Sequence, residues 1–552
     1  MDPAEPPAAP APAPAPAPGA PAGPAPRRKP AAALAVGAGI LLSRLTGLVR
    51  ERVFAHYLGN SDAAGAFKAA LRIPNLLQNL FGEGVLSASF IPVYARLLAE
   101  GKREEAARVA SVVASLLALA TGVLVLVGTL AARWLIDVIA PGYHGDVREL
   151  TVLLVRVMFA GIGLLVLSAW CLGVLNSHRR FFLSYVAPVL WNLAQIVVLI
   201  AVGGRALSSR AGQMELVEWV AWATVAGAAL QLLSQLPLAL RLVGRFRPGV
   251  RGGPAAGSVR KVLGNFVPVV ISRGVVQLSA YIDQVLASYL GPAAVSGMFY
   301  AQTLYLLPIS LFGMAISAAE LPEMSSALGT DEEVASKLRD RLRGAMGRVS
   351  FFVIPSAVAF VALGDVVVSA VFQTGKFGAS DTELVWLILG GSSVGMLAAT
   401  QARLCSSAFF ALGDARTPLR FAIVDVSLTA SLGYLAAMPL REAMDWPMAY
   451  GAAGLAAAAG LAGWVELVLL RRALGRRIGR VPMAGSTQLR ALAAALVAGA
   501  AAFGLRRVLP LHQPVLVAVV VLGLYGALYL AGTTMLGVPE ARGLMRRLRR
   551  RR

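Results

Sequence analysis

The chain has 552 residues, of which 57% are hydrophobic and only 14% are charged, and its mean hydropathy is +0.69. A soluble domain cannot bury that much apolar surface, so the composition predicts a polytopic membrane protein. The net charge of +22 would suggest nucleic-acid binding in a soluble protein. Here the basic residues lie between apolar stretches, where they set topology and face anionic lipid, so we expect no nucleic-acid partner.

The N-terminal residues 1–32 form a Pro/Ala-rich tract that ends near the basic run Arg27-Arg28-Lys29. Proline at this density prevents a helix, so we predict a disordered tail. A signal peptide is the alternative, because a basic cluster precedes an apolar run. That run starts at Ala31, continues past the length of a signal core and contains arginines, so we interpret it as the first membrane helix.

The rest of the chain is divided into fourteen apolar stretches, most of them at least the roughly 20 residues that cross a bilayer as a helix. They lie at about 33–57, 67–95, 106–134, 150–175, 182–204, 217–243, 262–290, 295–324, 347–373, 383–411, 418–439, 448–472, 487–508 and 514–537. Every second connection is rich in Lys and Arg, which marks the cytoplasmic side. We therefore predict an all-α polytopic membrane protein with both termini in the cytoplasm.

Two stretches of similar sequence indicate an internal repeat. Leu80-Phe81-Gly82 is followed by Ser87-Ala88-Ser89 and Pro92, and Leu311-Phe312-Gly313 is followed by Ser317-Ala318-Ala319 and Pro322. Chance is the alternative, because these residue types are common in membrane helices. Six helices separate the copies, so they point the same way across the membrane. A repeat predicts two six-helix lobes around a central cavity (33–243 and 244–475), two further helices (476–538) and a basic cytoplasmic tail (539–552).

Ionisable residues inside the first predicted span mark a candidate site. Such a residue costs about 2.5–3.5 kcal/mol to insert and therefore usually faces water or a partner. The span contains Arg44, Arg50 and Glu51. Arg44, Gly47 and Glu51 share one helical stripe, while Arg50 points away from it. For Arg50 the alternative is a helix-end arginine that reaches the lipid headgroups.

A second polar stripe lies on the seventh span, where four side chains share one helix face: Arg273, Gln277, Tyr281 and Gln284. Acidic residues within spans are Glu83, Asp283, Glu320, Asp425 and Glu466. For each acid alone, a structural ion pair is the alternative to ligand binding. Together these residues predict a polar interior, which Glu51, Glu83, Gln277, Gln284 and Ser296 are expected to support.

The motifs of common enzyme classes are missing from the sequence. It has no Walker loop and no His-Glu-x-x-His, and solvated helix faces explain acidic pairs such as Glu104-Glu105. Cys171 and Cys405 fall within spans and lack CxxC spacing, so we predict neither a disulfide nor a metal site. We expect no enzymatic activity and no cofactor. Buried arginines without a carboxylate cluster favour recognition of an anion such as a phosphate.

Several sequence blocks are specific enough to indicate a family. They are Ser43-Arg44-x-x-Gly47-x-x-Arg50-Glu51, Ile73-Pro74-Asn75-Leu76, Phe81-x-Glu83-Gly84-x-x-Ser87-x-x-Phe90-Ile91-Pro92, Ala140-Pro141-Gly142, Gly173-x-Leu175-Asn176, Ala187-Pro188-x-x-x-Asn192, Gly375-x-Phe377 and Asp414-x-Arg416-Thr417-Pro418. Over roughly residues 33–475 the chain resembles the murein lipid II flippase family (MurJ, formerly MviN). That family belongs to the multidrug/oligosaccharidyl-lipid/polysaccharide exporter superfamily.

The resemblance implies a V-shaped cavity that opens alternately to the two sides of the bacterial inner membrane. It also implies movement of lipid II, an undecaprenyl-pyrophosphoryl saccharide-peptide, to the outer leaflet for peptidoglycan synthesis. It assigns Arg44 and Arg50 to the pyrophosphate and the last two spans to the lipid tail, and it places Asp283 where some members have a sodium ligand. We add Asp425 as a second candidate for the cation. Arg273 matches no family feature, and we predict that it holds the pyrophosphate from the second lobe.

The chain also departs from the family pattern. Members usually carry an acid at the position of Gly65, an arginine at Gln78 and an acid–arginine pair at Gln302-Thr303. These losses leave open an exporter of another polyprenyl-linked saccharide or of cationic drugs. They also leave open a transport-inactive scaffold that recruits cell-wall synthesis proteins, and more remotely a glycosyltransferase. For a transporter, the membrane potential, Na+ or H+ is expected to bias the return step.

Overall fold

The computed structural model describes residues 30–314, 330–479 and 485–549, together with residues 316, 317, 320 and 324. Within these residues the regular elements are helices. The first eight α-helices are α1 (Pro30–Leu58), α2 (Asp62–Phe81), α3 (Glu83–Ala99), α4 (Arg103–Leu130), α5 (Ala132–Ile139), α6 (Gly145–Ser177), α7 (Phe181–Val202) and α8 (Arg210–Val243). A 3-10 turn, η1 (Gly203–Leu207), joins α7 to α8. We refer to α1–α8 as the N-half.

The second part begins with a 3-10 turn, η2 (Gly253–Ala255), and includes a π-helical turn, η3 (Ile309–Met314). Its α-helices are α9 (Ala256–Leu290), α10 (Pro292–Pro308), α12 (Asp331–Phe372), α13 (Ala379–Ser393), α14 (Met396–Ala411), α15 (Arg416–Ala437), α16 (Pro439–Ala443) and α17 (Met448–Ile478). We refer to α9–α17 as the C-half. The chain then continues through α18 (Gly485–Val508), α19 (Pro514–Met535) and α20 (Pro539–Arg549).

In the described part of the chain each predicted span falls on a helix or a helix pair, with two notable breaks. Residues 315, 318–319 and 321–323 of the predicted span 295–324 lie outside the described residues. The predicted span 67–95 is wrong as one continuous helix, because the backbone leaves helical geometry at Gly82 (φ −91°, ψ −143°) between α2 and α3. The predicted span 383–411 is two helices, α13 and α14, bent by 41°. The third helix ends at Leu130, and the short α5 follows it.

By length and apolarity, ten helices in the described part of the chain can cross a membrane, or eleven if α13 and α14 count as one span. The count of fourteen therefore stays a prediction. The helices that are not apolar enough by this criterion include α1, α2 and α9, which carry charged residues such as Arg50 and Lys68. A helix with polar residues in its middle is suited to the interior of a bundle and not to lipid.

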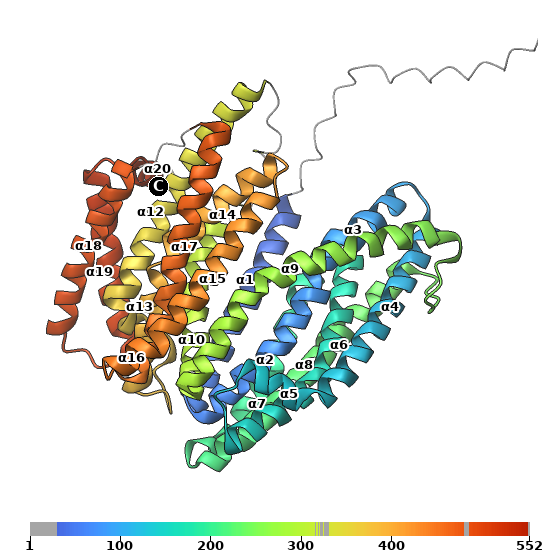
Figure 1. The fold of residues 1–552 in the computed structure, drawn as a ribbon, viewed down its shortest axis with the longest axis horizontal. Helices are drawn as coiled ribbons and strands as arrows, with labels where there is room; N and C mark the ends of the chain where they lie inside the picture. The colour runs from blue at the N-terminus through green and yellow to red at the C-terminus, as the bar shows by residue number, and fades with distance from the viewer. Residues whose placement is uncertain are drawn as a thin grey trace, which may run out of the picture.

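The helices form two groups with α1 and α9 running between them (Figure 1). In the N-half α6 packs against α8 and α4, and α7 packs against α1; in the C-half α17 packs against α13, α14 and α15. The pair α18–α19 packs on α12, at the side of the C-half away from the N-half (Figure 1). The lobe boundary at residue 244 stays a prediction.

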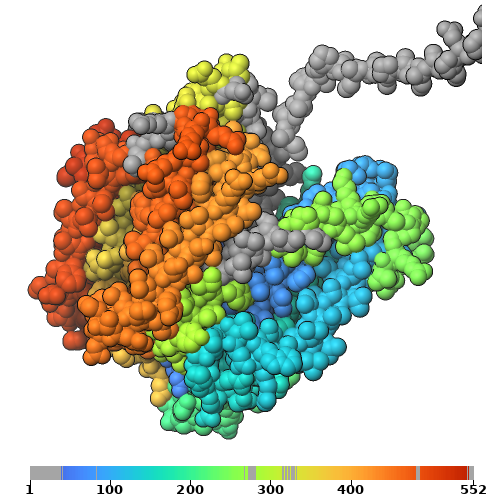
Figure 2. Space-filling model, viewed as in Figure 1, coloured from blue at the N-terminus to red at the C-terminus, as the bar shows by residue number. Residues whose placement is uncertain are grey.

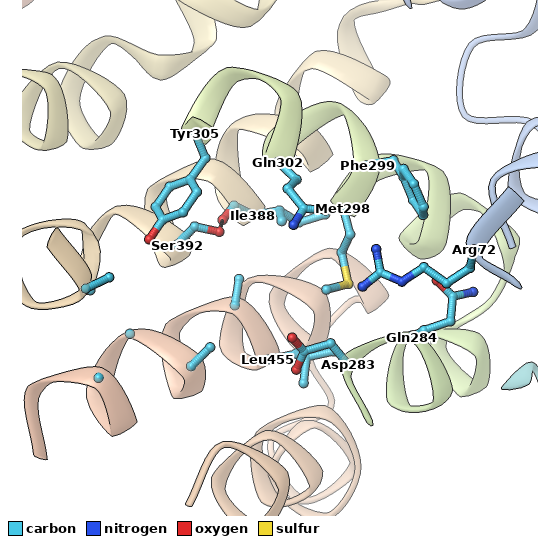
Figure 3. A pocket seen from close by; sticks show the side chains of 16 residues that line it. Arg72, Asp283, Gln284, Met298, Phe299, Gln302, Tyr305, Ile388, Ser392 and Leu455 are labelled. Atoms are coloured by element: carbon cyan, nitrogen blue, oxygen red, sulfur yellow. Dashed lines mark hydrogen bonds between the residues drawn. The ribbon is translucent and has the colours of Figure 1, made fainter. Parts of the chain in front are cut away.

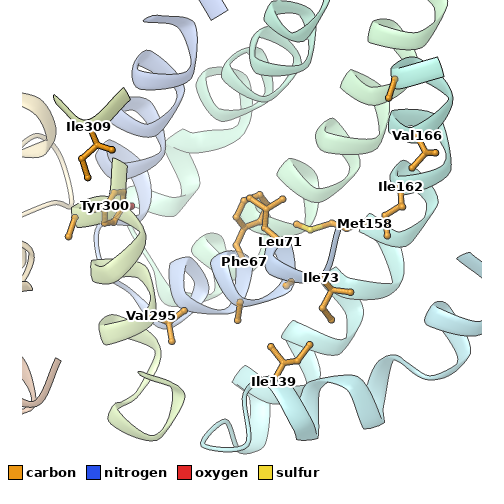
Figure 4. Close-up of a cluster of buried hydrophobic side chains, with 14 of the residues drawn as sticks. Phe67, Leu71, Ile73, Ile139, Met158, Ile162, Val166, Val295, Tyr300 and Ile309 are labelled. Carbon is orange, nitrogen blue, oxygen red and sulfur yellow. The ribbon is translucent and has the colours of Figure 1, made fainter. Parts of the chain in front are cut away.

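The hydrophobic core continues from one half into the other through α2. Phe67 and Leu71 of α2 lie between Met158 of α6 and Tyr300 of α10, all of them buried (Figure 4). In the space-filling view the two halves are in contact over the lower part of the molecule, where α10 lies between them (Figure 2). A second core joins α12 to α18 and α19 around Phe351 and Tyr525. The halves are thus tied together mainly at one end.

Candidate functional site

The two halves are joined by polar contacts at the end where α1 passes into α2. The hydroxyl of Tyr300 donates to the carbonyl oxygen of Gly59 (3.0 Å), and that of Ser296 donates to Asn60 Oδ1 (2.9 Å). The backbone N–H of Lys376 donates to the carbonyl oxygen of His56 (2.8 Å). We call this region the closed end. Ser296 is fully buried in this contact, and its predicted role in supporting the cavity stays a prediction.

A buried ion cluster lies between α1 and α2. Glu51 accepts from Arg50 through Oε1 (2.6 Å) and from Lys68 through Oε2 (2.5 Å). The Lys68 side chain is 2% exposed, that of Glu51 9% and that of Arg50 15%. Glu51 is thus shared by two cations, and the cluster carries a net positive charge.

Arg50 also contacts two residues that line a polar cavity in the N-half, Asn192 and Trp191. It donates to Asn192 Oδ1 (3.0 Å), and its guanidinium lies 4.8 Å from the centre of the Trp191 ring. Both residues line a cavity of about 270 Å³ between α1, α2, α6, α7 and α8. Its other polar lining residues are Ser43, Asn75, Gln78, Ser168 and Gln231. Amide and hydroxyl groups beside a guanidinium suit a ligand with a charged and a hydroxylated part.

A second cavity, of about 190 Å³, lies between α2 and the C-half. Figure 3 shows Arg72 and Asp283 directed into it, with Met298 of α10 between them. Gln302 and Tyr305 line it from α10, and the Arg72 guanidinium lies 5.4 Å from the centre of the Phe299 ring. This cavity therefore combines one cation and one carboxylate with an aromatic and amide wall.

The sequence-predicted residues are distributed unevenly over these features. Arg50 and Glu51 share the ion cluster, and Asp283 and Gln284 line the second cavity. Arg44 is exposed on α1, and Asp425 is half-buried on α15, lining neither cavity. The side chains of Arg273, Gln277 and Glu83 lie outside the described side chains, so their roles stay predictions.

Sequence reasoning missed Lys68 and Arg72. The two are spaced by four residues on α2, so they lie on one helix face inside a stretch predicted to be apolar. That spacing was the available signal, and it was as strong as the stripe on the seventh span. The packing of α2 against α10 explains why position 65 is a glycine here and not an acid. A Cβ on Gly65 would lie 2.4 Å from the Cβ of Pro292.

Among the described residues no group of three His, Cys, Asp or Glu side chains is arranged to hold a metal ion. Cys171 and Cys405 are both buried as free thiols. Two helical halves joined at one end, with a cavity lined by Arg72 and another whose wall contacts Arg50, have the construction of a membrane transporter.

The comparisons with known proteins agree with that class and make it specific. The family described as lipid II flippase MurJ matches residues 54–534. The chain is 32% identical over 455 residues to the lipid II flippase MurJ of Burkholderia cenocepacia, covering 81% of this chain and 84% of that one. It is 31% identical to a probable lipid II flippase MurJ of Rhizobium tropici, covering 80% of each. The chain belongs to the lipid II flippase MurJ family.

Solved structures show the same fold. A lipid II flippase MurJ in an inward closed conformation superposes with a TM-score of 0.74 at 20% identity, covering 93% of this chain and all of that one. An inward-facing MATE family multidrug transporter of the MOP superfamily superposes with a TM-score of 0.59 at 17% identity, covering 81% of this chain and 98% of the transporter. The predicted resemblance and the all-α polytopic class are confirmed.

Proposed function

We propose that this protein is the lipid II flippase of its cell and moves the polyprenyl-diphosphate saccharide-peptide from the inner to the outer leaflet. The observation that carries the proposal is the pair of cavities that share α2 in their walls, one beside Arg50 and the other lined by Arg72. Guanidinium groups bind phosphate oxygens through paired hydrogen bonds, and the amides around Arg50 suit a saccharide. The family and the curated relatives point to the same substrate.

The proposed transport cycle is alternating access of the two halves. Arginines such as Arg103, Arg179, Arg241 and Arg245 line a hollow of about 1070 Å³ formed by the C-terminal part of α3, the beginning of α4 and the ends of α6 and α8. By the excess of positive charge, that side is the cytoplasmic side, so the closed end faces outward. We propose that this conformation receives the substrate from the inner leaflet. Release outside requires α10 to separate from α2 and from the connection between α1 and α2.

For the coupling ion we propose Asp283 as a ligand. Its Oδ1 is buried and has no hydrogen-bond partner among the described residues. A buried carboxylate oxygen without a partner is costly, and a bound Na+ or a proton would remove that cost. Asp425 stays a second candidate on α15. No cofactor beyond this ion or the membrane potential is proposed.

One observation favours an alternative. The carboxylate of Asp283 lies in a cavity with Phe299, Met298 and Tyr305, which suits an organic cation. An exporter of cationic drugs would use this cavity alone. A lipid II flippase would also need Arg50 beside the N-half cavity. A scaffold without transport would need neither.

The test is reconstitution in proteoliposomes with fluorescent lipid II in the inner or outer leaflet. The parent protein should flip lipid II, and Arg72→Ala and Arg50→Ala should each slow flipping by about tenfold or more, since a charge-assisted hydrogen bond contributes about 1.5–3 kcal/mol. Arg205→Ala is the matched control, because Arg205 is 76% exposed and distant from both cavities. Efflux of an organic cation without lipid II flipping would favour the exporter, and neither activity would favour the scaffold.

A further inference from the structure

Lys68 is enclosed in a way that prevents it from reaching a ligand itself. Its ammonium lies 4.2 Å from the centre of the Phe54 ring, 5.6 Å from that of Tyr300 and 5.9 Å from that of Phe299. These rings come from α1 and α10, and the lysine itself is on α2, so the ammonium is held at the junction of the two halves. Among the described side chains, its one carboxylate contact is Glu51 Oε2.

Arg50, in contrast to Lys68, lies where a ligand can approach it. Its guanidinium is held by Glu51 and Asn192 and lies over the ring of Trp191. Asn192 and Trp191 both line the N-half cavity, and the Arg50 side chain is 15% exposed. A guanidinium has five N–H donors, and the two contacts on Arg50 occupy only part of them. A phosphate oxygen arriving in the cavity would compete with Glu51 for this group.

That competition depends on Lys68. If Glu51 had only Arg50 as its partner, transfer of Arg50 to a phosphate would leave a buried carboxylate unpaired, which is strongly unfavourable. With Lys68 on Oε2, Glu51 stays paired when Arg50 leaves Oε1. Arg50 can therefore leave the cluster while the ion pair between Glu51 and Lys68 remains.

We propose that Lys68 is a positioning residue that neutralises Glu51 and so frees Arg50 to bind the diphosphate of the substrate. The proposal deepens the proposed function and rests on it for the identity of the ligand. It assigns Lys68 no contact with substrate. It also gives a reason for a lysine within residues 63–71 of α2, which are otherwise apolar.

The test measures binding of farnesyl diphosphate to the purified full-length protein in detergent. Lys68→Met should weaken binding about tenfold, because Glu51 then holds Arg50 alone. The double variant Glu51→Gln/Lys68→Met should recover affinity to within about threefold of the parent, because the carboxylate that retains Arg50 is gone. Lys68→Arg should retain binding, and Lys102→Met is the control, since Lys102 is 57% exposed in a loop.

Recovery in the double variant is the result that a merely structural role for Lys68 does not predict. Equal loss in the single and double variants, or unchanged binding in Lys68→Met, would overturn the proposal. If Lys68→Met does not fold, the double variant decides alone: near-parental affinity supports the proposal and loss overturns it. If the parent binds farnesyl diphosphate with this dependence on Lys68 but does not flip lipid II, the proposed function fails and this inference stands.

Discussion

Tyr300 of α10 donates its hydroxyl hydrogen to the carbonyl oxygen of Gly59, directly after α1, across the junction of the two halves. Tyr300 is fully buried and packs against Phe372 and Phe377 of the C-half. The hydrogen bond is therefore formed in this conformation, and it must break if the closed end opens.

Removing this hydrogen bond should shift the protein toward conformations in which the two halves are separated at the closed end. Tyr300→Phe keeps the ring packing and deletes the donor, at a cost of about 1 kcal/mol to the closed conformation, or about a fivefold shift in population. Spin labels at His144 and Ser380, both exposed, should report it as a larger fraction of long distances. An unchanged distance distribution would show that this bond does not hold the closed end.

Gly65 should be intolerant of even a methyl group. Alanine is favoured over glycine by about 1 kcal/mol inside a helix, but its Cβ would lie 2.4 Å from both the Cβ and the carbonyl oxygen of Pro292. Gly65→Ala should therefore weaken the contact between α2 and α10 and reduce flipping. Gly122→Ala is the matched control, because nothing lies within 4 Å of its added Cβ. If both variants flip lipid II equally well, the close approach at Gly65 is not needed for transport.

The tyrosines of α19 should fix α18–α19 to α12. Pro355 has no backbone N–H, so the carbonyl oxygen of Phe351 one turn earlier lacks its helical partner. Tyr529 supplies the missing donor at 2.6 Å, and Tyr525 donates to the carbonyl oxygen of Pro355 at 2.8 Å. An unpaired carbonyl inside a membrane protein is costly.

Tyr529→Phe should therefore lower the free energy of unfolding by about 1–3 kcal/mol, the usual cost of an unsatisfied buried group, and so lower the melting temperature of the purified protein. Tyr434→Phe, at an exposed tyrosine, should leave stability unchanged. A melting temperature that is the same in both variants would mean that water or lipid replaces the tyrosine donor.

Asp414, in the loop between α14 and α15, should make stability depend on pH. The backbone N–H and hydroxyl of Thr417 donate to its carboxylate, Arg477 pairs with it, and these partners hold the pKa of Asp414 below its ordinary value of 3.8. A depressed pKa adds stability above the ordinary value, and this stability is lost as the pH falls toward the depressed value. The melting temperature of Asp414→Asn in detergent should therefore fall less steeply than that of the parent as the pH is lowered from about 5 to about 3. Parallel curves would contradict the assignment.

The amino-acid sequence was enough to predict the all-α membrane class, the approximate position of the helices and the family. Long apolar stretches and blocks such as Ile73-Pro74-Asn75 carry these features locally, so no knowledge of packing is needed. The sequence also identified Arg50, Glu51, Asp283 and Gln284, because polar groups in apolar helices are conspicuous.

Which of these groups are in contact could be learned from the packing of the helices alone. The pairing of Glu51 with Lys68 joins the consecutive helices α1 and α2. The position of Ser296 at the closed end and the wall formed by Arg72 and Asp283 join segments that are distant in the chain. The break at Gly82 was equally invisible in the apolar pattern. Helical periodicity fixes the face on which a side chain lies, but the partner of that face depends on how helices pack, and packing is set by contacts between distant segments.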